Sequence, residues 1–211
     1  MLFRSIIKGE LENLLTHNGL PPAAEQRIVS AQQEVDRMQQ IIDQLLLLAR
    51  FDTGKASSGY AAIEVSQLLD ELGEDVDLLG AKSELRISHQ ITPGIRVRGD
   101  AVQLRRLFLN LFTNAAKYNL PQGTLHYQLT RHGDRAHFAI SNSGPIIAAA
   151  NHERIFERFF QSDESHSARG SGLGLSLCRE IAQAHGGTIQ LVSSSTAATQ
   201  FLVTLPTIPT S

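Results

Sequence analysis

Apolar residues repeat at helical spacing through the first fifty positions and predict two helices. The first set ends before Asn18-Gly19 and Pro21-Pro22, which stop one helix and prepare the next. The second set follows the seams of a heptad repeat from Ile28 to Ala49. A two-helix hairpin cannot bury such a stripe by itself, so we expect two hairpins to pair as a homodimeric four-helix bundle. The alternative is that the stripe packs only against the rest of its own chain.

The remaining pattern predicts a second, α/β unit. A polar connector at 54–60, rich in Gly and Ser, separates a hairpin at 1–53 from a domain at 61–208. A helix with apolar positions between Val65 and Leu79 comes first, and Asp100 is placed to cap a later helix. Short alternating segments, which read as strands, occur in consecutive pairs at 85–91 and 95–99, 124–130 and 136–141, and 188–193 and 199–206. This order predicts a mixed sheet with helices on one face.

The run RGSGLGLSLCR, at 169–179, has the properties of a phosphate cradle. Gly170, Gly172 and Gly174 permit backbone angles and close approaches that a side chain would forbid, so successive N–H groups can point at one anion. The residues after them have helical spacing, which places the glycines at a positive helix N-terminus. Such a run alone also fits a plain tight turn.

A polar trio on the capped helix adds complementary chemistry. Asn110, Asn114 and Lys117 are spaced four and then three apart, so they share one helix face. An amide oxygen can bind a hard cation, and an ammonium group can neutralise phosphate. Taken alone, the trio also fits an ordinary exposed helix face.

The ordered set NLFTNAAKYN (110–119), ISNSGPII (140–147), IFERFF (155–160) and the glycine run resembles the nucleotide-binding boxes of sensor histidine kinases. The resemblance implies the Bergerat ATP-binding fold, a two-layer α/β sandwich, with ATP and Mg²⁺ as ligands. It implies Asn114 as the metal ligand, and Asn110, Lys117, Arg158 and Arg169 as the residues that act on the phosphates. The nucleotide-binding residues that it implies are Asn110, Asn114, Lys117, Tyr118, Asn142, Gly144, Ile147, Phe156, Phe159, Gly170, Ser171, Gly172, Leu173, Gly174 and Leu175.

Several positions refine that expectation. Related chaperone and gyrase ATPases carry a water-activating glutamate where this chain has the neutral Asn110, which favours transfer to a histidine over hydrolysis. Asn142 replaces the usual adenine-binding Asp and can still make a two-point match with adenine. Ile146 replaces a glycine of the family pattern. Phe156 and Phe159 fit core packing at least as well as nucleotide binding, and the polar segment 161–169 is expected to be a mobile lid that orders on ATP.

The hairpin resembles the dimerisation and phosphoacceptor hairpin of the same kinases, but it lacks one part. The family's acceptor histidine lies in a His-Glu-x-x-x-Pro setting that occurs nowhere in this chain, and His17 at the predicted turn is the hairpin's only histidine. We therefore expect a chain truncated before its acceptor, able to bind ATP and unable to label itself. The resemblance implies a response-regulator receiver domain as partner, and the cytoplasmic portion of an inner-membrane bacterial sensor.

Composition argues against nucleic-acid binding and against a membrane span in this chain. A net charge of −2 offers no basic surface for nucleic acid, and no apolar run approaches the length of a membrane span, so any membrane contact belongs to other parts of a parent protein. The single Cys178 is expected to be a small buried residue, and the remaining histidines show no metal-ligand spacing. Two alternatives remain open: a partner-sequestering ATP-binding module of the anti-sigma-factor type, and a chaperone- or gyrase-type ATPase switch.

Overall fold

The computed structural model describes residues 9, 20–53, 59–82, 84–161 and 170–209. The chain divides into two compact units, Met1–Ala49 and Arg50–Ser211. In the first unit the structure describes helix α2 (Pro22–Asp52). It begins at a proline, as the sequence predicts. Its last turn, from Arg50, belongs to the second unit. Apart from Gly9, the first predicted helix and His17 lie outside the described residues, as does 162–169, which contains Arg169. Among the described residues, none of the helices combines the length and the apolar composition of a membrane span.

The second unit is built on a five-stranded mixed sheet with the order β2-β4-β5-β7-β6. Its strands are β2 (Arg86–Ile91), β4 (Thr124–His132), β5 (Arg135–Asn142), β6 (Thr188–Ser194) and β7 (Thr199–Pro206). The β2–β4 pair is parallel and the other three pairs are antiparallel. The mixed sheet predicted from the sequence is therefore confirmed.

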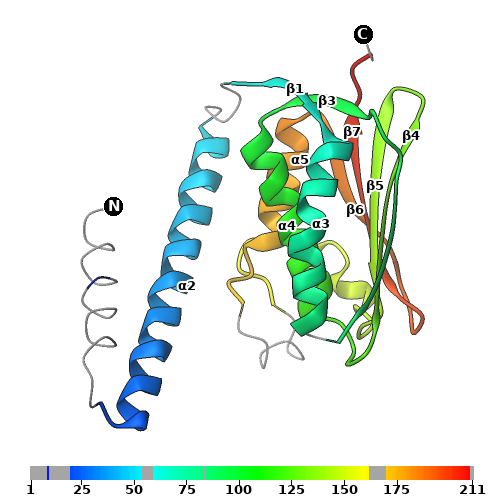
Figure 1. Cartoon of the computed structure of the whole chain (residues 1–211). Helices are drawn as coiled ribbons and strands as arrows, with labels where there is room; N and C mark the ends of the chain where they lie inside the picture. Colours follow the sequence, from blue (N-terminus) through cyan, green and yellow to red (C-terminus); the bar gives the residue numbers. More distant parts are fainter. Residues whose placement is uncertain (1–8, 10–19, 54–58, 83, 162–169, 210–211) are drawn as a thin grey trace. The chain divides into compact units, whose positions relative to one another are not determined.

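Three helices, α3 (Val65–Lys82), α4 (Ala101–Lys117) and α5 (Gly174–Ala184), cover one face of this sheet (Figure 1). Alternate residues of β4 and β5 point into this layer, so their apolar side chains meet the apolar faces of the helices. Phe108 and Phe112 of α4 make edge contacts with Phe138 and Tyr127 of the sheet, with ring centroids 4.8 and 4.9 Å apart. This aromatic core holds α4, the helix of the polar trio, against the sheet.

The strands at 85–91 and 95–99, consecutive in sequence, belong to different sheets. The first becomes β2 beside β4, whereas β3 (Arg96–Gly99) pairs with β1 (Ala61–Glu64) in a separate two-stranded sheet. The sequence did not predict β1, because AAIE is too short and too exposed to show an alternating pattern. The segment 149–156 forms two short 3₁₀ helices, η2 (Ala149–Asn151) and η3 (Arg154–Phe156).

Asp100 caps α4 as predicted, since its carboxylate accepts hydrogen bonds from the N–H groups of Val102 and Gln103. The N–H of Asp100 itself donates to Nε2 of His185, at 3.1 Å. Nδ1 of His185 lies 2.7 Å from the carbonyl oxygen of Ile181, and its ring stacks on Tyr60. His185 therefore ties the end of α5 to the start of α4, in the neutral form with its proton on Nδ1.

We expect the stability of this unit to fall at mildly acidic pH because of His185. Burial lowers its pKa below the ordinary value, an effect that the Ile181 carbonyl and Asp100 only partly offset. Below about pH 6.5 the unfolded chain binds the proton more readily, so the contribution of His185 is complete above that pH and is lost as the pH falls toward its folded pKa. Urea unfolding at pH 7.5 and 5.5 measures this effect. Between these two pH values, the free energy of unfolding should fall less for His185→Gln than for the unsubstituted chain. The exposed His126→Gln is the control and should keep the full loss; equal losses in all three proteins would contradict this role for His185.

Candidate functional site

The polar face of α4 meets the start of α5 at Asn114 and Gly174. A Cβ atom added to Gly174 would lie 3.9 Å from Nδ2 and 4.0 Å from Oδ1 of Asn114. The two helices are adjacent in the sheet-covering layer (Figure 1). The end of the glycine run and the second asparagine of the trio, sixty residues apart in sequence, are thus brought together.

The start of α5 has the features of an anion-binding terminus. Leu173 occupies the cap position, and no side chain among the described residues makes a capping hydrogen bond there. The first turn also contains no acidic residue, so no carboxylate within that turn offsets the positive end of the helix dipole. A phosphate group would satisfy both.

Gly172 gives the glycine run its shape. Its φ of +69° lies in the left-handed region, and its carbonyl accepts a hydrogen bond from the N–H of Phe159, at 2.9 Å. A Cβ atom on Gly172 would come within 2.6 Å of the Phe159 carbonyl carbon. Glycine is therefore required both for the turn and for the contact with the 155–160 segment.

The Asn110 amide has a nitrogen without a hydrogen-bond partner among the described residues. This nitrogen, Nδ2, is buried. Burial raises the pKa of the Cys178 thiol to about 12, and the Asn110 side chain beside it acts in the opposite direction. Cys178 is fully buried and its Sγ donates to the Leu107 carbonyl, which confirms its predicted structural place. A buried amide with an unused donor is costly unless a ligand or water satisfies it.

Lys117 and Tyr118 form a pair at the end of α4. The ammonium group donates to the Tyr118 hydroxyl at 3.0 Å and lies 4.7 Å from the centre of its ring. Lys117 is partly exposed, so its charge remains accessible to an anion.

The other end of the site is built around Asn142, the last residue of β5. Asn142 is buried, and its Nδ2 donates to the Tyr118 carbonyl at 3.4 Å. A Cβ atom on Gly144 would collide with the same carbonyl oxygen, so glycine is needed there too. The N–H of Ile147 donates to Ser194 Oγ, whereas the side chain of Ile146 is exposed. A buried side-chain amide suits a flat ligand with a polar edge, such as a purine base.

The two phenylalanines of the 155–160 segment behave differently. Phe156 is buried and makes an edge contact with Phe201. Phe159 is 60% exposed and has a φ of +65°, which is rare for a residue with a side chain. Core packing therefore accounts for Phe156 and not for Phe159.

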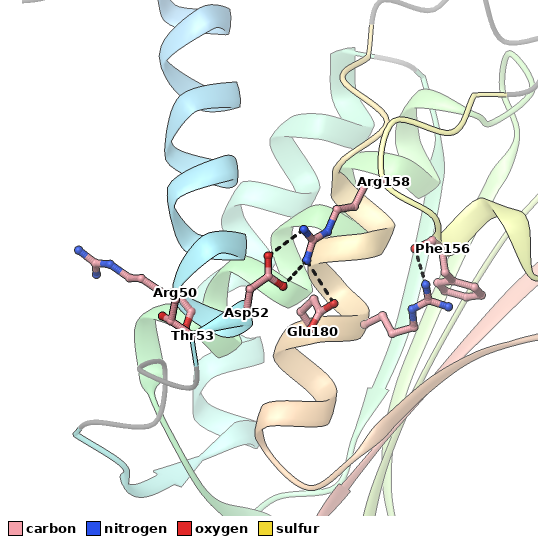
Figure 2. Close-up of polar contacts among 7 residues, drawn as sticks. Arg50, Asp52, Thr53, Phe156, Arg158 and Glu180 are labelled. Carbon is pink, nitrogen blue, oxygen red and sulfur yellow. Dashed lines mark hydrogen bonds and ion pairs between the residues drawn. The ribbon is translucent and has the colours of Figure 1, made fainter.

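Arg158 is bound by two carboxylates in this structure. Its guanidinium donates to both oxygens of Asp52, at 3.0 and 2.7 Å, and one nitrogen lies 3.7 Å from Glu180 (Figure 2). Arg169, the second arginine expected to act on the phosphates, lies outside the described residues.

Some residues that shape the site carry no strong signal in the sequence. Ser143 accepts from the Thr124 N–H and donates to Asn119, which fixes the chain between α4 and β4. Gln161 donates to the Gly170 carbonyl at 2.8 Å and so joins the 155–160 loop to the glycine run. Asp52 lies 106 residues from Arg158, so only the folded structure reveals their pairing.

Two family models match the chain and together cover most of it. Residues 99–209 match "Histidine kinase-, DNA gyrase B-, and HSP90-like ATPase", and residues 5–54 match "His Kinase A (phospho-acceptor) domain". The first match includes the trio, the glycine run and Asn142. The chain belongs to the histidine kinase-, DNA gyrase B- and HSP90-like ATPase family. The phospho-acceptor model before the ATPase model identifies the sensor histidine kinases as its branch.

Curated relatives agree with this placement. The chain is 32% identical over 178 residues to the circadian input-output histidine kinase CikA of Synechococcus elongatus, a match that covers 81% of this chain and 23% of CikA. It is 28% identical over 192 residues to the phosphate regulon sensor protein PhoR of Pseudomonas aeruginosa, covering 90% of this chain and 43% of PhoR. The signal transduction histidine-protein kinase BaeS of Escherichia coli is 28% identical over 204 residues, covering 96% of this chain and 43% of BaeS. The chain thus spans less than half of each of these histidine kinase family members.

Solved structures share the fold. The mycobacterial sensor histidine kinase MprB is 28% identical and superposes with a TM-score of 0.63. The match covers 72% of the present chain and 99% of the MprB chain. Full-length ShkA in complex with AMPPNP is 23% identical with a TM-score of 0.81, covering 99% of this chain and 44% of ShkA. The second match supports the fold alone.

Proposed function

We propose that this histidine kinase family member is the ATP-binding catalytic portion of a sensor histidine kinase, which transfers the γ-phosphate of ATP to a histidine for relay to a response-regulator aspartate. The observation that carries the proposal is the placement of the Asn114 amide against Gly174, at the start of α5, where no side chain among the described residues makes a capping hydrogen bond. A polyphosphate bound there would meet helix N–H groups on one side and polar side chains of α4 on the other.

The donor set fits ATP with Mg²⁺. Asn114 would bind the metal through its amide oxygen, since Mg²⁺ keeps water and phosphate oxygens in its other positions. The metal would supply charge neutralisation at the phosphates. Lys117 would neutralise phosphate as a point charge, and the unsatisfied Nδ2 of Asn110 would gain an acceptor. Gly170, Ser171, Gly172, Leu173, Gly174 and Leu175 would line the phosphates, and Tyr118, Asn142, Gly144 and Ile147 the nucleoside.

Asn110 favours phosphotransfer over hydrolysis. A neutral amide is a poor proton acceptor, so water beside the γ-phosphate would receive no general-base help from this position. ATP hydrolysis by the chain is therefore slow, in contrast with an ATPase switch of the chaperone type.

The hairpin would dimerise with a second copy. Large apolar side chains of α2 remain exposed in the single chain, including Met38, Ile42 and Leu46 at 54%, 49% and 59% exposure. Helix pairing would bury them, which supports a homodimeric four-helix bundle. The proposed portion acts in the cytoplasm beside ATP and meets the receiver domain of its response regulator there.

Incubation with γ-³²P-labelled ATP and Mg²⁺ tests this proposal. We expect tight retention of nucleotide, slow release of labelled phosphate and no acid-labile phosphate on the chain, because His17 lacks the acceptor setting of the family. A supplied hairpin that contains a His-Glu-x-x-x-Pro acceptor should become labelled. Brisk phosphate release would instead favour the chaperone-type ATPase, and label on the chain itself would contradict the missing acceptor.

A further inference from the structure

A forked ion pair binds the last turn of α2 to the loop beside the glycine run. Arg158 donates to Oδ2 and Oδ1 of Asp52, at 3.0 and 2.7 Å, and lies 3.7 Å from Glu180 of α5. Both Asp52 and Arg158 belong to the compact unit that begins at Arg50. Figure 2 shows the guanidinium pointing at both carboxylates, away from Phe156. Hydrogen bonding to Arg158 lowers the pKa of Asp52, and the same contact raises the pKa of Arg158, so the pair is charged at neutral pH.

The backbone of Arg158 borders the proposed phosphate site. The next residue, Phe159, donates its N–H to the Gly172 carbonyl, and its backbone would touch any side chain at position 172. Consecutive Cα atoms lie about 3.8 Å apart, so the long arginine side chain starts one residue from the glycine run. Its present direction is set by Asp52 and Glu180.

A guanidinium group can form a bidentate pair of hydrogen bonds with one oxyanion at a time. Carboxylate and phosphate oxygens compete for the same N–H donors, because both accept the parallel pair of hydrogen bonds that Arg offers. The Asp52–Arg158 pair is half-exposed, with side-chain exposures of 52% and 38%, so a stronger anion can displace the carboxylate at little cost.

We propose that Asp52 is a positioning residue for Arg158: with Glu180, it holds the guanidinium off the nucleotide, and the γ-phosphate of ATP must compete with this pair. The inference rests on the proposed function. Since Asp52 ends the helix that continues into the hairpin, ATP and the end of α2 compete for one side chain. By linkage, a change in α2 that withdraws Asp52 strengthens ATP binding by the same factor by which ATP weakens the ion pair.

The test compares Mg-ATP and Mg-ADP affinities of the full chain by calorimetry. Asp52→Asn should strengthen ATP binding on the order of fivefold and leave ADP binding unchanged, because ADP has no γ-phosphate to receive Arg158. If Asp52 had only a structural role, the substitution would change the affinities for Mg-ATP and Mg-ADP by the same factor. Glu71→Gln is the matched control: it breaks another exposed pair, Arg105–Glu71 at 2.8 Å with exposures of 38% and 49%, and should change neither affinity.

A second variant completes the cycle. Arg158→Gln should weaken ATP binding relative to ADP, and Asp52→Asn should add nothing in that background. An unchanged ATP-to-ADP ratio in folded Asp52→Asn, confirmed by an unchanged thermal melt, would overturn the role of Asp52 while leaving the proposed function intact. Failure of the unsubstituted chain to bind either nucleotide would overturn the proposed function and, with it, this inference.

Discussion

Replacing Asn114 with alanine should weaken Mg-ATP binding by at least about 100-fold while leaving the apo protein folded. The variant removes the amide that faces Gly174 and the start of α5, and with it the proposed metal ligand. Loss of a metal ligand predicts a weakening of about 100-fold or more, or roughly 3 kcal/mol. Asn114 is only partly buried and alanine suits a helix, so the melting temperature should change by no more than about 4 °C. Calorimetric titration and a thermal melt measure the two effects.

Thr113→Ala is the matched control for that variant. Thr113 is the preceding residue of α4 and is exposed, so its substitution makes a similar change in helix propensity without touching the site. It should bind Mg-ATP like the unsubstituted chain. A collapse of the fold in Asn114→Ala, with affinity retained in whatever remains folded, would assign Asn114 a structural role instead.

Replacing Gly172 with alanine should damage both stability and nucleotide binding. Alanine in the left-handed region costs about 1–2 kcal/mol, and the clash with the Phe159 backbone adds about 1–3 kcal/mol for the forced displacement. The displaced loop also reshapes the proposed phosphate cradle, so Mg-ATP affinity should fall at least tenfold. Urea unfolding followed by nucleotide titration measures both effects.

Gly133→Ala separates backbone strain from the clash. Gly133 has a similar φ of +61°, but a Cβ there meets nothing within 4 Å. This control should lose about 1–2 kcal/mol from strain alone and keep full nucleotide affinity. If both variants lost the same stability and neither lost affinity, the close contact between Gly172 and Phe159 would have no importance for the site.

Local patterns in the sequence were sufficient for most elements and for the residues that gather around α4 and α5. Helical spacing placed Asn110, Asn114 and Lys117 on one face, and the glycine run preceded a helix that indeed begins at Gly174. The cap at Asp100 was predictable because an N-cap depends on neighbours within three residues.

Features that depend on distant residues could not be predicted in the same way. The partner of β3 is a four-residue strand without alternation, so the separate β1–β3 sheet had no local signal. The exposure of Phe159 follows from its left-handed backbone and its hydrogen bond to Gly172, which spacing alone does not reveal. Likewise, the sequence predicts that Arg158 binds phosphate, and only the folded chain shows its ion pair with Asp52.

Nuclear magnetic resonance of the ¹⁵N-labelled chain during titration with Mg²⁺ and a non-hydrolysable ATP analogue tests the central claim most directly. We predict saturable shifts in the side-chain amides of Asn110 and Asn114 and in the backbone amides of Gly172 and Gly174, with smaller shifts at Asn142. The exposed hairpin at Gly133 should remain unshifted. Saturable shifts that avoid α4 and the start of α5, or no shifts at millimolar nucleotide, would contradict the account.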